Sequence, residues 1–137
     1  LHGSTEQCLA VVMHLHKSGK GFHAYRDHQH RYSVRLGLYE SKSPPRPGDY
    51  IRLTLALEDD LVVGAEPAQP AKMTDVDFLE GKIRVNEKGF GFVEDTFVPP
   101  SLISDGMNGQ LVRVMKILDF DKAKNSPGWK ALTLEVI

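Results

Sequence analysis

The chain has 137 residues, of which 41% are hydrophobic and 26% charged, the composition of a soluble globular protein with one ordinary domain or two small ones. No apolar run approaches the roughly 18–20 residues of a membrane-spanning helix, and no signal-peptide pattern opens the chain. The net charge of −1 argues against a dedicated duplex binder, which needs many cationic contacts to phosphates. Because the single cysteine, Cys8, cannot form an internal disulfide, we expect a cytoplasmic protein with no membrane partner.

Short hydrophobic runs separated by turn residues predict an all-β protein. The first run, residues 9–15, alternates and places Leu9, Val11, Met13 and Leu15 on one face. Further short strands are predicted at 32–38, 50–57, 61–65, 82–85, 90–93, 111–118 and 131–137, and one helical turn is expected near 101–104. Many short strands with glycine, proline and asparagine turns are typical of a small barrel or sandwich.

The pattern of strands and turns occurs twice. Lys20-Gly21-Phe22 matches Lys88-Gly89-Phe90, and residues 48–53 match residues 109–114. We therefore predict two tandem five-stranded barrels, the first at 5–66 and the second at 78–137. Residues 67–77, which contain proline and alanine, are predicted to form a short stiff linker.

Three phenylalanines lie close together in the second copy. Residues 88–93 read Lys-Gly-Phe-Gly-Phe-Val, and Thr96-Phe97-Val98 follows. On a strand, Phe90 and Phe92 share one face with Lys88. Aromatic rings beside a positive charge suit unpaired bases, which need a π-face to stack on and a cation near the phosphate. Packing of the rings in the barrel core is the alternative, although it would bury Lys88 and leave glycine outside; Phe97 can face either way.

The second copy resembles a cold-shock domain, the five-stranded barrel of the OB class that binds single-stranded RNA and DNA. Residues 88–93 are similar to the first ribonucleoprotein motif of that family, and Asp95-Thr96-Phe97-Val98 is similar to the start of its second. The resemblance implies that Lys88, Phe90, Phe92 and Phe97 form the stacking platform. The sequence differs from the family at Arg84-Val85-Asn86, which has no aromatic residue, and at Pro99-Pro100, where histidine and phenylalanine are usual.

Two segments, Phe97-Val98-Pro99-Pro100 and residues 107–112, look more like the tandem cold-shock modules that precede the catalytic domain of ribonuclease II/R-type exonucleases. That resemblance implies an accessory region for handling RNA. Lys82 and Arg84 lie one pleat apart on one face and are expected to guide the backbone. Trp129, predicted in a hairpin loop, either stacks a base or covers a loop or partner surface. The predicted binding residues are Lys82, Arg84, Lys88, Phe90, Phe92, Phe97 and Trp129.

The first copy is degenerate, with Ala24 in the place of the second stacking phenylalanine. Tyr32, or the histidines at 14, 16 and 23, could take over some stacking. All six histidines lie in the first half, and pairs such as His14 and His16 have chelating spacing. Because no set of four ligands closes around them, we expect no metal ion and no other cofactor.

No catalytic motif is present, and Cys8 with a remote histidine is the only nucleophile–base pair available, so we do not expect an enzyme. The sequence favours a binding module for single-stranded nucleic acid, RNA rather than DNA. The alternative is a protein-interaction, scaffolding or regulatory module of a larger RNA-processing protein that has lost nucleic-acid binding. Salt dependence separates these functions, because phosphate contacts weaken as salt rises.

Overall fold

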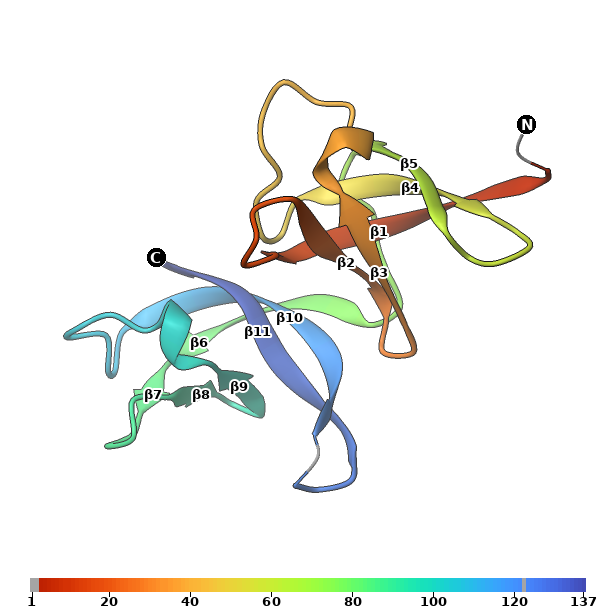
Figure 1. Cartoon of the computed structure of the whole chain (residues 1–137). Coiled ribbons are helices and arrows are strands. Elements are labelled where there is room, and N and C mark those ends of the chain that lie inside the picture. Colours follow the sequence, from red (N-terminus) through yellow and green to blue (C-terminus); the bar gives the residue numbers. More distant parts are fainter. Residues whose placement is uncertain (1–2, 122) are drawn as a thin grey trace. The chain divides into compact units, whose positions relative to one another are not determined.

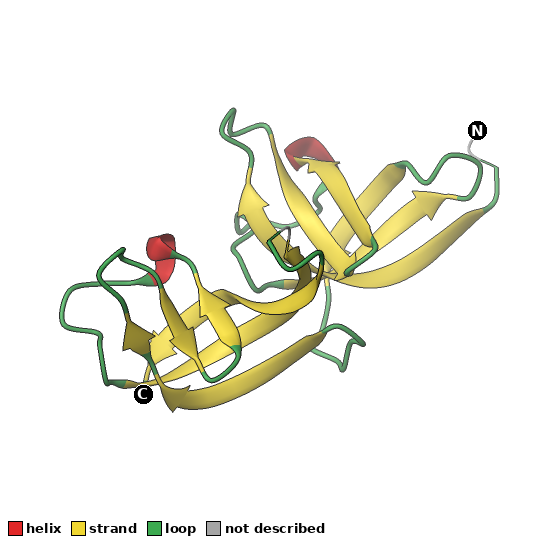
Figure 2. Cartoon of the chain, turned by 90° about the horizontal axis from the view of Figure 1, so that it is seen from below, coloured by secondary structure: helices red, strands yellow, loops and turns green. Residues whose placement is uncertain are grey.

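The computed structural model describes residues 3–121 and 123–137 and is built almost entirely from β-strands (Figure 2). The chain divides into two compact units, Leu1–Met73 and Thr74–Ile137. Among the described residues, the helices are two single 3-10 turns, η1 (Leu36–Leu38) and η2 (Pro100–Leu102). No helix in this part of the chain is long and apolar enough to cross a membrane.

The first unit is a curled five-stranded sheet (Figure 1). Its strands lie in the order β3-β2-β1-β4-β5. A parallel bridge between Tyr39, which follows η1 after β3, and Ala65 on β5 brings the two edges of the sheet together. The strands are β1 (Thr5–Leu15), β2 (Gly21–Asp27), β3 (His30–Arg35), β4 (Tyr50–Ala56) and β5 (Val62–Pro67).

The second unit has six strands in the order β6-β10-β11-β9-β8-β7. Its two outermost strands, β6 and β7, are consecutive in the chain and separated only by Ile83, so the sheet curls back on itself. Lys130 on β11 and Phe97 on β9 form the parallel pairing that completes the curl. The strands are β6 (Val76–Lys82), β7 (Arg84–Val85), β8 (Gly91–Val93), β9 (Thr96–Val98), β10 (Leu111–Asp121) and β11 (Ser126–Val136).

The two units share one topology. The first part of β1 pairs with β4 and its last part with β2, just as β6 pairs with β10 and β7 with β8. The glycine turns coincide as well. The Gly48 N–H donates to the Val12 carbonyl and the Gly109 N–H to the Ile83 carbonyl, each at 2.8 Å. The prediction of an all-β chain with two tandem OB-like barrels is confirmed.

Each barrel has its own apolar core. The first contains Phe22, Val34, Ile51, Leu53 and Leu55, and the second contains Ile83, Val93, Val98, Val112 and Val114, all fully buried. These side chains come from alternate positions of the strands, as expected when one face of a sheet is buried.

The predicted alternation of Leu9, Val11, Met13 and Leu15 is wrong beyond the middle of β1. The register of β1 against β2 shifts between Val12 and His14, which marks a bulge. An extra residue in one strand interrupts the alternation, so Leu15 is exposed although Met13 is buried. The core of the first barrel receives Ala10 and Val12 instead.

Several element boundaries also differ from the sequence expectation. The strand predicted at 131–137 begins at Ser126, and that predicted at 32–38 ends at Arg35, where η1 follows. β5 ends at Pro67 and β6 begins at Val76, so both strands extend one or two residues into the predicted linker.

Candidate nucleic-acid interface

The three phenylalanines of the second barrel meet on its outer surface. β8 and β9 pair antiparallel with Phe92 opposite Phe97. On each strand the two flanking residues are buried, Gly91 and Val93 around Phe92, and Thr96 and Val98 around Phe97. Alternation therefore directs both rings away from the core.

Phe90, just before β8, completes the cluster. Its ring centroid lies 6.0 Å from that of Phe92 and 5.4 Å from that of Phe97, and the Phe92–Phe97 separation is 5.9 Å. Phe92 is 37% exposed, so core packing does not describe this residue. Three mutually contacting rings that are only partly covered form an aromatic platform, defined here as Phe90, Phe92 and Phe97.

Two glycines, Gly89 and Gly91, allow the backbone conformation that brings the platform rings together. Gly91 faces inward, where an added Cβ would lie 2.7 Å from the Arg84 carbonyl oxygen and 3.4 Å from Ile103 Cδ1. Gly89 has φ +90°, a conformation that other residues rarely adopt, and it forms the tight turn from β7 to β8. The glycines thus let β7 and β8 approach closely and bring Phe90 beside Phe92.

The three predicted cationic residues near the platform lie in different elements. Arg84 is exposed and pairs directly opposite Phe92. Lys88 is exposed in the β7–β8 turn, where its N–H donates to Asn86 Oδ1 at 3.0 Å. Lys82 is exposed at the end of β6, opposite Leu111. Of these three residues, Arg84 is the one that the strand pairing places directly beside an aromatic ring.

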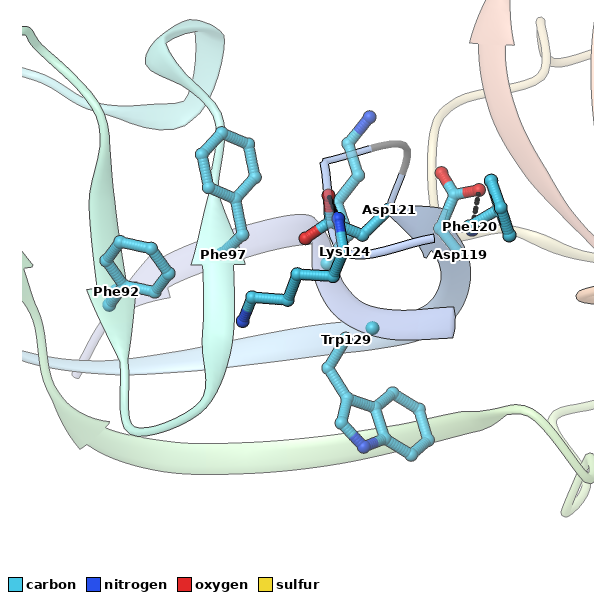
Figure 3. A pocket seen from close by; sticks show the side chains of 9 residues that line it. Phe92, Phe97, Asp119, Phe120, Asp121, Lys124 and Trp129 are labelled. Atoms are coloured by element: carbon cyan, nitrogen blue, oxygen red, sulfur yellow. Dashed lines mark hydrogen bonds between the residues drawn. The ribbon is translucent and has the colours of Figure 1, made fainter. Parts of the chain in front are cut away.

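A pocket of about 360 Å³ opens beside the platform, near the lower limit for ligand pockets. Figure 3 shows Phe92 and Phe97 on neighbouring strands, with Asp121 and Lys124 of the β10–β11 hairpin across the opening. Its lining consists of Phe92, Phe97, Asp119, Phe120, Asp121, Lys124, Gly128, Trp129 and Lys130.

Trp129 lies within β11, paired with Leu118, so its predicted place in a hairpin loop is wrong. β11 begins at Ser126, before the predicted start at residue 131, and therefore includes Trp129. The Lys116 ammonium lies 4.2 Å from the centroid of the indole ring, a cation–π contact. Trp129 therefore lines the pocket with an ammonium over one face of its ring.

The charge of the pocket is mixed. The carboxylate of Asp121 accepts the Ala123 N–H at 2.9 Å and holds the hairpin turn, and Asp119 accepts the Phe120 N–H at 2.7 Å. Lys124 and Lys130 supply the positive charge. With two acids and two lysines in the lining, aromatic contact rather than net charge is the dominant feature.

Sequence reasoning missed Phe120, Lys124 and Lys130. Lys130 reaches the platform through the parallel pairing of β11 with β9, which joins residues far apart in sequence. Phe120 and Lys124 come from the long hairpin, whose extent the short predicted strand at 111–118 did not include. The sequence signal that could have indicated this hairpin is the alternation of Asp119, Phe120 and Asp121 before the turn at Asn125.

The counterpart of Phe92 in the first barrel is His23, not Ala24. His23 pairs with His14 on β1 and Ser33 on β3, as Phe92 pairs with Arg84 and Phe97. The glycine with positive φ in the preceding turn is Gly19, so matching the Lys-Gly-Phe triplets shifted the alignment.

Tyr32 does not face a ligand surface. It is part of the first core, and its hydroxyl oxygen accepts a hydrogen bond from Arg26 Nη1 at 3.3 Å. A stacking role for Tyr32 is therefore excluded by its burial, whereas His23 remains on the outer face.

The groups considered for catalysis or metal binding have other surroundings. Cys8 packs against the first core, and burial raises the pKa of its thiol, which disfavours the nucleophilic thiolate. Within the described residues, no group of three or more His, Cys, Asp or Glu side chains could hold a metal ion.

The comparison with protein families agrees with the geometry of the second barrel. Residues 78–134 match the family model described as S1/CSD-like domain 2 of the TOTE conflict systems. The matched segment is thus similar to an S1/CSD-like domain, and it contains the whole platform. No curated protein matches the chain. The finer likeness to ribonuclease II/R-type modules stays a prediction.

Proposed function

We propose that the second barrel binds single-stranded nucleic acid, RNA more readily than DNA, by stacking unpaired bases on the aromatic platform. The observation that carries this function is a cluster of three mutually contacting, partly exposed phenylalanines on a barrel whose sequence matches an S1/CSD-like domain model. An isolated monomer gains nothing from leaving such rings in water, and bases supply the planar apolar surface that covers them.

In this mechanism the rings contribute most of the affinity, and the cations orient the sugar–phosphate backbone of the bound strand. Each stacked base contributes about 1–3 kcal/mol by alanine substitution, so a few bases suffice for useful binding by a nearly neutral protein. Arg84 beside Phe92 and Lys130 beside Phe97 lie where phosphates of a strand crossing β8 and β9 would run. Every base offers a π-face, so sequence preference is expected to be slight.

A duplex does not suit this surface, because paired and stacked bases present no free faces. We propose a binding module rather than an enzyme. Direct titration tests it: a labelled single-stranded RNA, the matching DNA and the RNA duplex are added to the full chain and followed by fluorescence anisotropy. We expect RNA and DNA single strands to bind and the duplex to bind at least about tenfold more weakly, while equal binding of all three would contradict stacking.

The alternative, a protein-interaction module that has lost nucleic-acid binding, predicts no binding of any strand at tens of micromolar. It also predicts that the apolar rings contact a protein partner, in an interface that salt weakens little. The same titration at two salt concentrations therefore separates the two functions.

A further inference from the structure

The first barrel carries three histidines where the second carries its platform. His23 lies on β2 between Phe22 and Ala24, both fully buried, so its ring points outward as that of Phe92 does. By strand pairing, His14 corresponds to Arg84. The backbone hydrogen bonds of the turns place His16 at the position of Asn86. The carbonyl of His16 accepts the N–H of Gly19, and the carbonyl of Asn86 accepts the N–H of Gly89.

A bulge creates this arrangement. Without the register shift at Met13, His14 would share the inward face of Val12, two residues earlier. The extra residue rotates His14 outward and places it directly opposite His23. The ring centroids of His14 and His23 are 4.6 Å apart.

The ring of His16 also contacts that of His23. Their ring centroids lie 4.2 Å apart, and Ser33 Oγ lies 3.3 Å from His16 Nε2. Gly21 makes room for this ring, because a Cβ at that position would lie 3.1 Å from His16 Nδ1. The histidine cluster, defined here as His14, His16 and His23, is thus a set of rings in which His14 and His16 each contact His23.

The surrounding segment is basic although the chain as a whole is not. The three strands that carry the cluster and its turns, β1, β2 and β3, are adjacent in the sheet. Residues 14–35 contain five cationic side chains against the single acid Asp27, whereas the whole chain has a net charge of −1. The cations are Lys17, Lys20, Arg26, Arg31 and Arg35, of which Arg26 is engaged by Glu6 and by the Tyr32 hydroxyl, so the other four flank the cluster as candidates for phosphate contact.

We propose that the histidine cluster is a second binding site for unpaired nucleotides of single-stranded RNA, with bases stacking on imidazole rings and phosphates contacting the flanking lysines and arginines. This inference rests on the proposed function of the second barrel for the class of ligand, and on the first barrel alone for the site. Imidazole is planar and stacks on bases as other aromatic side chains do.

Binding at this site is coupled to protonation. Burial, followed by the neighbouring His14 and His16 and by Arg31 of β3, lowers the pKa of His23. Ser33 is the other β3 side chain that faces the cluster, and the acid Asp27 is engaged by His30 at 2.9 Å in the β2–β3 turn. A phosphate beside His23 favours its imidazolium, so RNA binding takes up a proton at this ring and tightens as pH falls toward the lowered pKa of His23.

The test reads the two barrels separately. The full chain, labelled with ¹⁵N, is titrated with a single-stranded uridine oligonucleotide of about six nucleotides. EDTA is present throughout, so that no metal ion bridges the imidazoles. We expect amide and imidazole signals of residues 21–24 to shift at about pH 6, and to shift less at about pH 8. Changes at 91–97 report the platform independently of this site.

Variants of His23 supply the chemical test in a chain that also carries Phe92→Ala, which removes a ring of the platform. His23→Ala should weaken binding at residues 21–24 at least about fivefold, the loss of one stacked base. His23→Phe should retain binding and lose much of its pH dependence. His28→Ala, which removes a histidine at the far end of the β2–β3 hairpin, is the matched control and should change little.

Three results would overturn the second site. Shifts confined to 91–97 would leave the proposed function intact and remove this site. Binding at 21–24 that survives His23→Ala unchanged would show that the ring does not contact the strand. An equal loss of binding at residues 21–24 in His23→Ala and His28→Ala would show that binding there depends on overall positive charge rather than on the His23 ring. The ¹⁵N spectra themselves show whether each variant is folded.

Discussion

His23 of β2 and Phe92 of β8 occupy the same position in two copies of one barrel, each opposite the outward-facing residue of the preceding strand. In one copy that partner is His14 and in the other Arg84. The fold thus keeps an outward ring at this position while its chemistry changes from apolar to ionisable.

The stability of the first barrel should depend on pH through His23. Because the pKa of His23 is lowered in the folded state, chiefly by burial, the unfolded chain takes up protons first. The free energy of unfolding of the first barrel is therefore highest above the ordinary histidine pKa. It decreases as pH falls from that value to the lower folded value, because in this range only the unfolded chain is protonated. We expect the Tm to fall between about pH 8 and about pH 5, and His23→Phe to flatten that fall. An unchanged slope in His23→Phe would assign the effect to other groups.

Gly91→Ala should destabilise the second barrel. An added Cβ would lie 2.7 Å from the Arg84 carbonyl oxygen, so the backbones of β7 and β8 must separate. We expect a loss of about 1–3 kcal/mol in the free energy of unfolding, measured with urea. Gly37→Ala is the matched control, because nothing lies within 4 Å of its added Cβ and its φ is not left-handed. Equal stability of the two variants would contradict the close approach.

Trp129, the single tryptophan, should report occupancy of the pocket without a label. A base entering beside Phe97 comes close to the indole, so we expect single-stranded RNA to change Trp129 emission with the same Kd as anisotropy. Lys116→Ala should shift the emission of the free protein, because it removes the ammonium 4.2 Å from the ring centroid. Binding by anisotropy with unaltered emission would mean that no base enters the pocket.

The salt dependence of binding to the platform should be shallow. Arg84, Lys124 and Lys130 offer up to three phosphate contacts, and a single strand gives about −0.7 in the log–log slope for each. We expect a slope of about −1 to −2, and Lys130→Gln should reduce its magnitude by about 0.7. A slope unchanged by Lys130→Gln would remove Lys130 from the interface, and a slope near zero would favour the protein-interaction function.

The all-β class, the tandem repeat and the outward position of Phe92 could be predicted because they rest on local signals. Glycine turns such as Gly48 and Gly109 occur at matching places, and period-two alternation places Phe92 on an outer face. Alternation alone does not decide which way Phe97 points; its pairing opposite Phe92 does.

What could not be predicted depends on register and on long-range pairing. The bulge at Met13 changes which residues of β1 face outward, and no residue type in this part of the sequence predicts a bulge. Matching the Lys-Gly-Phe triplets pointed to Ala24, because the β1–β2 turn is one residue longer than the β7–β8 turn when measured by its hydrogen bonds. The place of Lys130 follows from a parallel pairing across the barrel, which the order of residues does not reveal.

The most direct test of the stacking function compares two exposed phenylalanines of the same barrel. Phe92 is 37% exposed in the platform, and Phe78 is 43% exposed on β6, where Arg113 lies 4.6 Å from its ring centroid. The Kd for single-stranded RNA is measured by anisotropy for Phe92→Ala, Phe92→Trp and Phe78→Ala, with unfolding curves for each. We predict that Phe92→Ala weakens binding by about 1–3 kcal/mol, while Phe92→Trp and Phe78→Ala bind like the natural chain. Equal Kd values for Phe92→Ala and the natural chain, with both folded, would contradict base stacking on the platform.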